Sequence, residues 1–360
     1  MHERPKVGFN GEVTSRTDPD EQLELLARVA ELYYKGGLDQ TEIARRTGYS
    51  RSMISRLLTQ AVKQKVVEFH IYHPLNRCTD LERSMQQTFD LKEVRVLARG
   101  AMDYAEMLSK LGKLAARLVD EYLQNQTTVG VSWGTAVAAT INALRPKPRT
   151  SINVIQIIGS YGTPDPEVDG HELAHKLARI LGGKYAILPA PLVVGSEAMR
   201  NALLADPRVK QILNSARNMQ LALVGIGSVE AGLSSLVRAG YITKQHVREL
   251  AQTGAVGDVC ALNFDCAGNL VDTPLARRIV GIDARTLQQV PTKVGVAGGE
   301  EKAPAILGAV RGKFVNALVT DESAAIEMLK LAEESSSATH LTGRNSVSDA
   351  DKHGLTRTKS

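Results

Sequence analysis

Apolar residues follow two different patterns along the chain, and the change between them near Leu91 predicts two domains. Before this point they recur at helical spacing. In segment 21–35, for example, one side of a helix would carry Leu25, Leu26, Val29, Leu32 and Tyr33. Beyond it, short apolar runs alternate with longer amphipathic stretches, which is typical of strands and helices in a mostly parallel sheet. We therefore expect a helical N-terminal domain followed by a larger, Rossmann-like α/β domain.

Segment 39–59 predicts two short helices joined by a tight turn. Asp39 can cap the first helix together with Glu42 three residues later, and Gly48 suits the left-handed residue that ends it. Ser50 can cap the second helix. Its apolar face would consist of Met53, Ile54, Leu57 and Leu58. This arrangement is typical of the helix-turn-helix of DNA-binding proteins.

Charge separates a DNA-binding helix pair from a hairpin that serves only for packing. Between Ala44 and Val66 there are six basic residues and no acidic one, whereas a packing hairpin normally mixes signs on its solvated face. Side chains that donate to bases and phosphates are expected on the exposed face. We predict DNA contacts from Gln40, Thr41, Ser50, Arg51, Ser52, Ser55 and Arg56. The alternating segment 66–72 predicts a short strand, the wing of a winged helix.

The pattern beyond Leu91 predicts the strands and helices of the α/β domain. We expect strands at 93–97, 127–131, 153–158, 185–188, 221–225, 259–264, 293–297 and 317–320. We expect helices at 101–123, 135–144, 170–181, 197–204, 207–216, 244–251, 302–311 and 321–332.

Composition favours a soluble protein of the cytoplasm. The chain has 360 residues, enough for two or three domains, and 43% of them are hydrophobic, enough for a full core. Cys78, Cys260 and Cys266 have neither an even count nor the spacing of metal ligands, so we expect reduced thiols. No apolar run approaches the length of a membrane span, and the polar start is no signal peptide. The net charge of +5 is compatible with nucleic acid without being diagnostic of it.

Four loops of the second domain suit a ligand, because ligands in open α/β sheets bind outside the carboxyl ends of the strands. The loops combine glycines with polar residues and are 129–135, 225–228, 254–258 and 297–302. The first offers hydroxyls and the amides of a helix start, which together favour an anion. Asp258 could accept bonds from sugar hydroxyls, and Lys302 adds a cation. Taken alone, each loop fits plain turn geometry as well.

Taken together, these segments resemble the SorC family of bacterial sugar-responsive transcriptional regulators over nearly everything from Leu26 to Leu329. The matching stretches are LYYKGGLDQTEIARRTGYSRSMISRLL, GVSWGT, VIQIIGSYG, LPAPLVV, LVGIGS, GAVGDVCALNFDCAGN and VGVAGGEEKAPAILGAVRGKFVNALVTDE. The resemblance implies a winged helix-turn-helix followed by a domain similar to sugar-phosphate isomerases and deaminases. It also implies a homo-oligomer, commonly a tetramer, whose binding to double-stranded operator DNA responds to a phosphorylated sugar or polyol.

The resemblance also carries over individual effector-binding positions. They fall on Ser132, Gly134, Thr135, Asp169, His171, Asp258 and Lys302. One departure is Ala136, where relatives often have a second hydroxyl residue. The expected organisation is a disordered arm (1–20), a helix-turn-helix domain (21–73), a linker helix (74–90), a sugar-binding domain (91–332) and a disordered tail (333–360). We expect a repressor of a carbohydrate or polyol catabolic operon.

The alternative is a sugar-phosphate isomerase or deaminase with an appended DNA-binding domain. It would need an acid/base pair over the sugar, for which Asp258 and His171 are the candidates, and Lys302 could form an imine with an aldehyde sugar. We favour the regulator and expect no enzymatic activity and no cofactor. His171 and His175 lie one helical turn apart, but they lack a third ligand, so we expect no metal.

Overall fold

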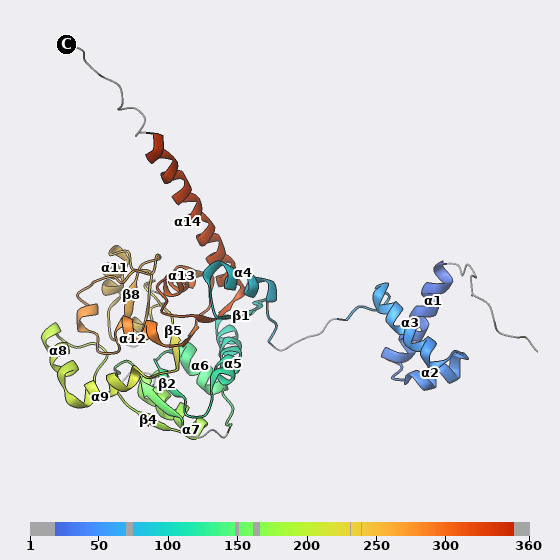
Figure 1. Ribbon diagram of the computed structural model, residues 1–360, viewed down its shortest axis with the longest axis horizontal. Helices are drawn as coiled ribbons and strands as arrows, with labels where there is room; N and C mark the ends of the chain where they lie inside the picture. Colours follow the sequence, from blue (N-terminus) through green and yellow to red (C-terminus); the bar gives the residue numbers. More distant parts are fainter. Residues whose placement is uncertain are drawn as a thin grey trace, which may run out of the picture. The chain divides into compact units, whose positions relative to one another are not determined.

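The computed structural model describes residues 19–69, 75–147, 151–160, 166–230, 232–238 and 240–348 (Figure 1). The chain divides into two compact units, Met1–His73 and Pro74–Ser360. Each unit has a hydrophobic core of its own.

The described part of the first unit is helical. It contains α1 (Pro19–Ala30), a π-helical turn (Glu31–Lys35), α2 (Gln40–Thr47) and α3 (Arg51–Lys63). The helices meet through aliphatic side chains at helical spacing, which bury their apolar faces against one another. The most buried of them are Leu26, Val29, Ile43, Ile54 and Ala61.

The predicted caps of α2 and α3 are confirmed. The Asp39 carboxylate accepts from the Glu42 amide at 2.8 Å, and the Glu42 carboxylate accepts in return from the Asp39 amide at 3.0 Å. Gly48 ends α2 with φ of 77°, a left-handed conformation that suits glycine. The Ser50 hydroxyl accepts from the Met53 amide at 3.2 Å and starts α3. These local interactions fix the turn between the two helices.

The strand predicted as a wing over 66–72 is absent from its described part, residues 66–69, and residues 70–72 lie outside the described ranges. Lys65 adopts φ of 58°, and the amides of Val66 and Val67 both donate to the Ala61 carbonyl. The chain after α3 therefore satisfies the end of that helix instead of extending as a strand. Farther on, Phe69 meets the ring of Tyr34, with 5.2 Å between the centroids.

The second unit is built on a seven-stranded sheet in which every pairing is parallel, in the order β1-β10-β9-β5-β2-β3-β4. The strands are β1 (Glu93–Leu97), β2 (Thr128–Val131), β3 (Asn153–Gln156), β4 (Lys184–Ala186), β5 (Leu221–Gly225), β9 (Thr292–Val296) and β10 (Ala317–Asp321). The predicted Rossmann-like α/β class is confirmed.

Helices cover both faces of this sheet. One face carries α5 (Tyr104–Tyr122), α6 (Thr135–Ala143) and α7 (Gly170–Leu181). The remaining α-helices of the second unit are α4 (Thr79–Phe89), α8 (Glu197–Ala205), α9 (Pro207–Ala216), α10 (Ser235–Arg238), α11 (Lys244–Gln252), α12 (Ala284–Gln289), α13 (Ala303–Arg311) and α14 (Glu322–Ser348). Side chains alternate along each strand. In β5, Leu221 and Leu223 enter the core under α5–α7, and Ala222 and Val224 enter the opposite core.

A small antiparallel sheet replaces the single strand predicted at 259–264. It consists of β6 (Gly227–Ser228), β7 (Gly257–Val259) and β8 (Leu262–Phe264). The prediction was wrong because Cys260 and Ala261 adopt φ of 53° and 57°, which turns the chain back as a two-residue hairpin. The apolar run gave no sign of this turn, since neither residue is Gly, Asn or Asp.

Two segments expected to flank the domain are longer or better packed than predicted. The helix expected as a linker, α4, belongs to the second unit, where it packs on β1 and buries Met85 completely. The last helix, α14, runs to Ser348, well into the tail expected to be disordered from 333. No Gly or Pro interrupts the sequence between Asp321 and Thr342, so propensity permits the extension. Of the arm expected over 1–20, residues 1–18 lie outside the described ranges. No helix in the described parts is long and apolar enough to cross a bilayer.

Candidate functional site

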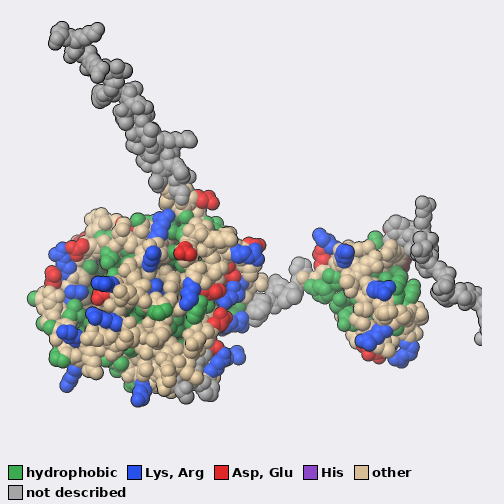
Figure 2. All heavy atoms as spheres, viewed as in Figure 1, with side chains coloured by type: hydrophobic (Ala, Val, Ile, Leu, Met, Phe, Trp, Pro, Cys, Tyr) green, Lys and Arg blue, Asp and Glu red, His purple; other side chains and the backbone are tan. Residues whose placement is uncertain are grey.

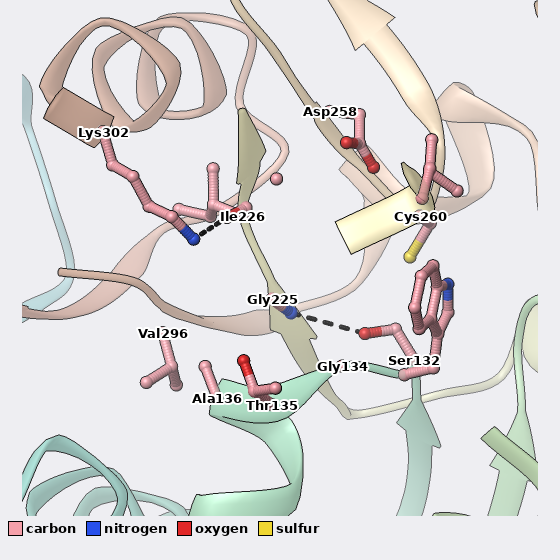
Figure 3. A pocket seen from close by; sticks show the side chains of 13 residues that line it. Ser132, Gly134, Thr135, Ala136, Gly225, Ile226, Asp258, Cys260, Val296 and Lys302 are labelled. Carbon is pink, nitrogen blue, oxygen red and sulfur yellow. Dashed lines mark hydrogen bonds between the residues drawn. The ribbon is translucent and has the colours of Figure 1, made fainter. Parts of the chain in front are cut away.

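A pocket opens at the point where the strand order of the large sheet reverses. From β2 the chain proceeds to β3 and β4 on one side, and then returns to β5, on the other side of β2. The loops that follow β2 and β5 therefore diverge, which leaves a crevice at the carboxyl ends of the strands. The residues that line it are Ser132, Trp133, Gly134, Thr135, Ala136, Gly225, Ile226, Gly227, Leu236, Asp258, Cys260, Val296 and Lys302 (Figure 3).

The floor of the pocket is the turn from β2 into α6. The buried Ser132 hydroxyl accepts from the Gly225 amide at 3.3 Å and so ties the two diverging loops together. Gly134 caps α6 with φ of 115° and ψ of 166°, a conformation that essentially only glycine adopts. It presents the first turn of α6, beginning at Thr135, to the pocket. The first amides of a helix have no partner within it, so this turn can bind an anion.

Asp258 and Lys302 reach the pocket from opposite sides (Figure 3). Asp258 lies on β7 beside the hairpin turn, where its carboxylate accepts from the Ala261 amide at 3.0 Å. Lys302 ends the short 3-10 turn before α13. It is 7% exposed, and its ammonium donates to the Ile226 carbonyl at 3.2 Å. A carboxylate and an ammonium thus face the same small volume.

Burial perturbs both groups. Loss of hydration raises the pKa of Asp258 from 3.8 to about 6, although the Ala261 amide and the Lys302 charge oppose the rise. Loss of hydration also lowers the pKa of Lys302, and the nearby positive charge of Arg238 lowers it further. An anionic ligand would relieve the repulsion between the two cations. Two perturbed groups of opposite charge therefore meet in the crevice, as is common at functional sites.

The pocket is small, with a volume of about 40 Å³. That volume accommodates only a few ordered water molecules. The buried Leu236 lines the pocket from α10, a helix of only four residues. Neither α10 nor the electrostatic effect of Arg238 on Lys302 was predictable from the sequence.

Five of the predicted ligand residues meet in this pocket: Ser132, Gly134, Thr135, Asp258 and Lys302. Asp169 and His171 do not line it. Asp169 caps α7, and its Oδ1 accepts from the His171 amide at 2.8 Å and from the Ser160 hydroxyl at 3.0 Å. The His171 side chain is exposed. Within the described ranges no three His, Cys, Asp or Glu side chains are grouped as metal ligands.

The predicted DNA-contacting residues lie on the surface of the first unit, where Figure 2 shows basic side chains. Arg51, Ser52, Ser55 and Arg56 form the exposed side of α3, opposite the buried Ile54. The remaining predicted residues are the exposed Thr41 and Ser50 and the half-buried Gln40. Ser50 also serves as the cap of α3, so its hydroxyl is partly committed.

Comparison with known proteins identifies similar chains. A family model described as "Putative sugar-binding domain" matches residues 73–330. The sorbitol operon regulator of Klebsiella pneumoniae is 32% identical over 312 residues, which cover 86% of this chain and 99% of the relative. The transcriptional regulator LsrR of Enterobacter sp. (strain 638) is 35% identical over 311 residues, 86% of this chain and 94% of the relative. The crystal structure of the full-length Klebsiella regulator SorC superposes with a TM-score of 0.64 at 31% identity, over 86% of this chain and 99% of that one.

Proposed function

The chain belongs to the SorC family of sugar-binding transcriptional regulators, and from this premise we propose that it represses a carbohydrate or polyol catabolic operon under the control of a phosphorylated sugar. The observation that carries the proposal is the pocket at the reversal of strand order, where a helix start, an ammonium and a carboxylate converge. Such a set fits a ligand with an anionic end and a hydroxyl-bearing end.

The anionic end fits the first turn of α6. Backbone amides and the helix dipole favour a phosphate there, and the Thr135 hydroxyl can add a further bond. Lys302 supplies positive charge, and Arg238 lies close enough to affect the pKa of Lys302. Ala136 also lines the pocket, so this chain lacks the side-chain hydroxyl that a Ser or Thr would add at that position.

The hydroxyl-bearing end fits Asp258. A carboxylate can accept bonds from two adjacent hydroxyls, which pays for part of its desolvation and favours its ionised form. Burial raises the pKa of Asp258, and hydroxyl donors from a ligand would lower it again. We propose a pentose, hexose or polyol phosphate, and take Asp169 and His171 as residues that approach the ligand only if the pocket opens.

The first unit would bind the operator through the N-terminal part of α3. In helix-turn-helix proteins this part of the second helix contacts base edges in the major groove. Arg51 and Arg56 are exposed and can donate to guanine or phosphate. The proposed oligomer, a tetramer in the family resemblance, would present such helices in pairs.

The enzyme alternative has no specific support. His171, its proposed partner for Asp258, does not line the pocket, and the relatives compared above are transcriptional regulators. A pair of groups over the reacting carbons is the minimum for acid/base catalysis of isomerisation. The pocket therefore supports binding rather than turnover.

Calorimetry with a panel of pentose, hexose and polyol phosphates tests the proposal. We expect one class of phosphate to bind wild type and its unphosphorylated form to bind at least about tenfold more weakly, because the helix start and Lys302 lose their anion. Lys302→Ala should lose binding while retaining operator affinity. Lys330→Ala, an exposed lysine of α14 outside the pocket, is the matched control. Undiminished binding by Lys302→Ala would reject this pocket as the site.

A further inference from the structure

Two consecutive acidic residues at the end of β10 connect segments that are far apart in the sequence. Asp321 is completely buried. Its Oδ1 accepts from the Gly299 amide at 2.7 Å, and its Oδ2 accepts from the Arg99 guanidinium at 3.1 Å and the Ser323 hydroxyl at 2.6 Å. A buried carboxylate is stable only when its lone pairs are satisfied in this way, so these contacts hold one another in place.

The first arm of this network leads to the pocket. Gly299 begins the turn that ends at Lys302, whose amide donates to the Gly299 carbonyl at 3.0 Å. The turn has little freedom to shift, because a Cβ at the preceding Gly298 would lie 2.6 Å from Leu111 and 3.0 Å from the Asp321 carboxylate. Lys302 and the Gly299–Asp321 hydrogen bond therefore belong to the same short, tightly packed turn.

The second arm leads to residues 76–78. We call them the entry segment, because the second unit begins just before them, at Pro74. The Arg99 amide donates to the Glu322 carboxylate at 3.1 Å. Next to Arg99, the Ala98 amide donates to the Asn76 carbonyl at 2.9 Å. Burial and the neighbouring Glu322 carboxylate raise the pKa of the Cys78 thiol to about 11, which places that carboxylate against the entry segment as well.

The entry segment is firmly attached to β1. The Cys78 amide donates to the Val96 carbonyl at 2.9 Å. Arg77 forms a two-point ion pair with the buried Glu82, whose carboxylate also accepts from the Val96 amide at 2.8 Å. A shift at the end of β1 would therefore move the entry segment as a body.

We propose that Arg99, Asp321 and Glu322 are the positioning residues that couple occupancy of the Lys302 pocket to the entry segment. This inference rests on the proposed function for its biological meaning, but the coupling itself is a property of the fold. Both arms are contiguous chains of hydrogen bonds and ion pairs, and they meet at two adjacent residues. Contiguity makes a route physically possible, whereas coupling must be measured.

Hydrogen exchange on the ligand-free protein measures it directly. Lys302→Met should increase exchange at the Gly299 amide, and through the network it should increase exchange at Cys78 and Ala98 by about threefold or more. In an Arg99→Gln background the increase at Gly299 should remain, and the increase at Cys78 and Ala98 should vanish. A merely structural role for Arg99 would raise exchange without removing this dependence on Lys302.

Arg95→Gln is the matched control. Arg95 lies on β1, two residues before the end of the strand. It forms ion pairs with Glu93 at 3.1 Å and with Glu121 at 3.0 Å, and neither pair leads to the pocket. In the Arg95→Gln background, Lys302→Met should increase hydrogen exchange at Cys78 and Ala98 as much as it does in wild type. If Arg99→Gln fails to fold, Ser323→Ala removes the hydroxyl bonded to both Arg99 and Asp321 and should weaken transmission.

Operator binding gives the second readout. With the phosphate of the panel that binds wild type most tightly, Arg99→Gln should reduce the ligand-induced change in operator Kd at least about fivefold, the lower end of typical allosteric couplings. Arg95→Gln should leave it unchanged. If no phosphate binds, the proposed function fails, and the exchange experiment still decides the coupling. The inference is overturned if Lys302→Met increases exchange at Cys78 equally in the wild-type and Arg99→Gln backgrounds. It is also overturned if Lys302→Met has no effect at Cys78 in the wild-type background.

Discussion

At the scale of single residues, the electrostatics of Asp258 dominate the pocket. Its pKa of about 6 lies above the ordinary value of 3.8 because burial disfavours the charged form. The folded protein therefore binds this proton more tightly than the unfolded chain does. Its contribution to stability is largest below about pH 4 and is lost as pH rises through about 6. At neutral pH the empty site is held at a cost in stability, as is common at binding sites.

We predict that Asp258→Asn stabilises the ligand-free protein. The neutral amide needs no proton, so the variant should exceed wild type by about 2 kcal/mol in free energy of unfolding at pH 7.5 and should show no loss between pH 4 and 6.5. Urea unfolding followed by Trp133 fluorescence measures this in the second unit, since Trp133 is the single tryptophan of the chain and lines the pocket. Lower stability of the variant at pH 7.5 would contradict the assignment of the pKa.

Some residues of the pocket could be predicted from the sequence because they are neighbours in one loop. Ser132, Gly134 and Thr135 stand in one strand-to-helix turn, so a single loop pattern located them together. Arg238 was missed because nothing in its own segment marks it. It acts on Lys302 only through the folding of two loops far apart in the chain. The exclusion of His171 from the pocket lining also depends on the direction of a side chain, which sequence does not contain.

At the scale of elements, the start of α6 depends on its cap. Gly134 has φ of 115°, where an L side chain is strained even though the space for a Cβ is open. We predict that Gly134→Ala costs about 1 to 3 kcal/mol of stability or shifts the first turn of α6, and weakens phosphate binding at least about tenfold. Gly195→Ala, also in open space but without a positive φ, should change neither. Trp133 fluorescence titrations compare the two variants, and equal affinities would show that the cap does not position the ligand.

Helix α3, which we propose as the recognition helix that contacts DNA, offers an independent test. We predict that Arg51→Ala and Arg56→Ala each abolish specific operator protection in a footprint and leave sugar-phosphate affinity unchanged, because the two functions lie on separate units. Lys63→Ala is the control on the same helix. It is exposed and lies about 18 Å from Arg51 and about 10 Å from Arg56 along α3, at a rise of about 1.5 Å per residue. It should weaken binding only through general attraction to phosphates. Wild-type protection by both arginine variants would show that α3 is not the recognition helix.

Elements were predictable from sequence where local chemistry determines them. The capping box of Asp39 and Glu42 and the left-handed Gly48 determine both ends of α2 through local interactions, so the sequence alone predicts this helix. The hairpin at Cys260 and Ala261 was not predictable, because its residues tolerate positive φ only within the packed sheet around them. The prediction of a wing strand was wrong for a related reason. The segment that contains Val66 and Val67 alternates as a strand does, but the amides of both residues donate to the Ala61 carbonyl at the end of α3.

At the scale of the whole molecule, the two units bring separate functions into one chain. Each has its own core, so neither function requires the other unit for its local geometry. Regulation requires that the empty and the occupied second unit favour different arrangements of the recognition helices. A ligand that bound both arrangements equally would change nothing, however tight its binding.

We predict that operator binding requires an oligomer and that the sugar phosphate changes the arrangement of its DNA-binding units. Paired recognition helices contact half-sites about 34 Å or a multiple of that distance apart, so the footprint should show two related half-sites in helical phase. Insertion of about five base pairs between them should abolish protection, whereas insertion of about ten should restore part of it. Adding the phosphate that binds the Lys302 pocket should reduce operator retention at a protein concentration where light scattering shows an unchanged oligomer, because the ligand shifts its arrangement and does not dissociate it. A monomer on a single half-site, or retention that no phosphate alters, would contradict regulation by this route.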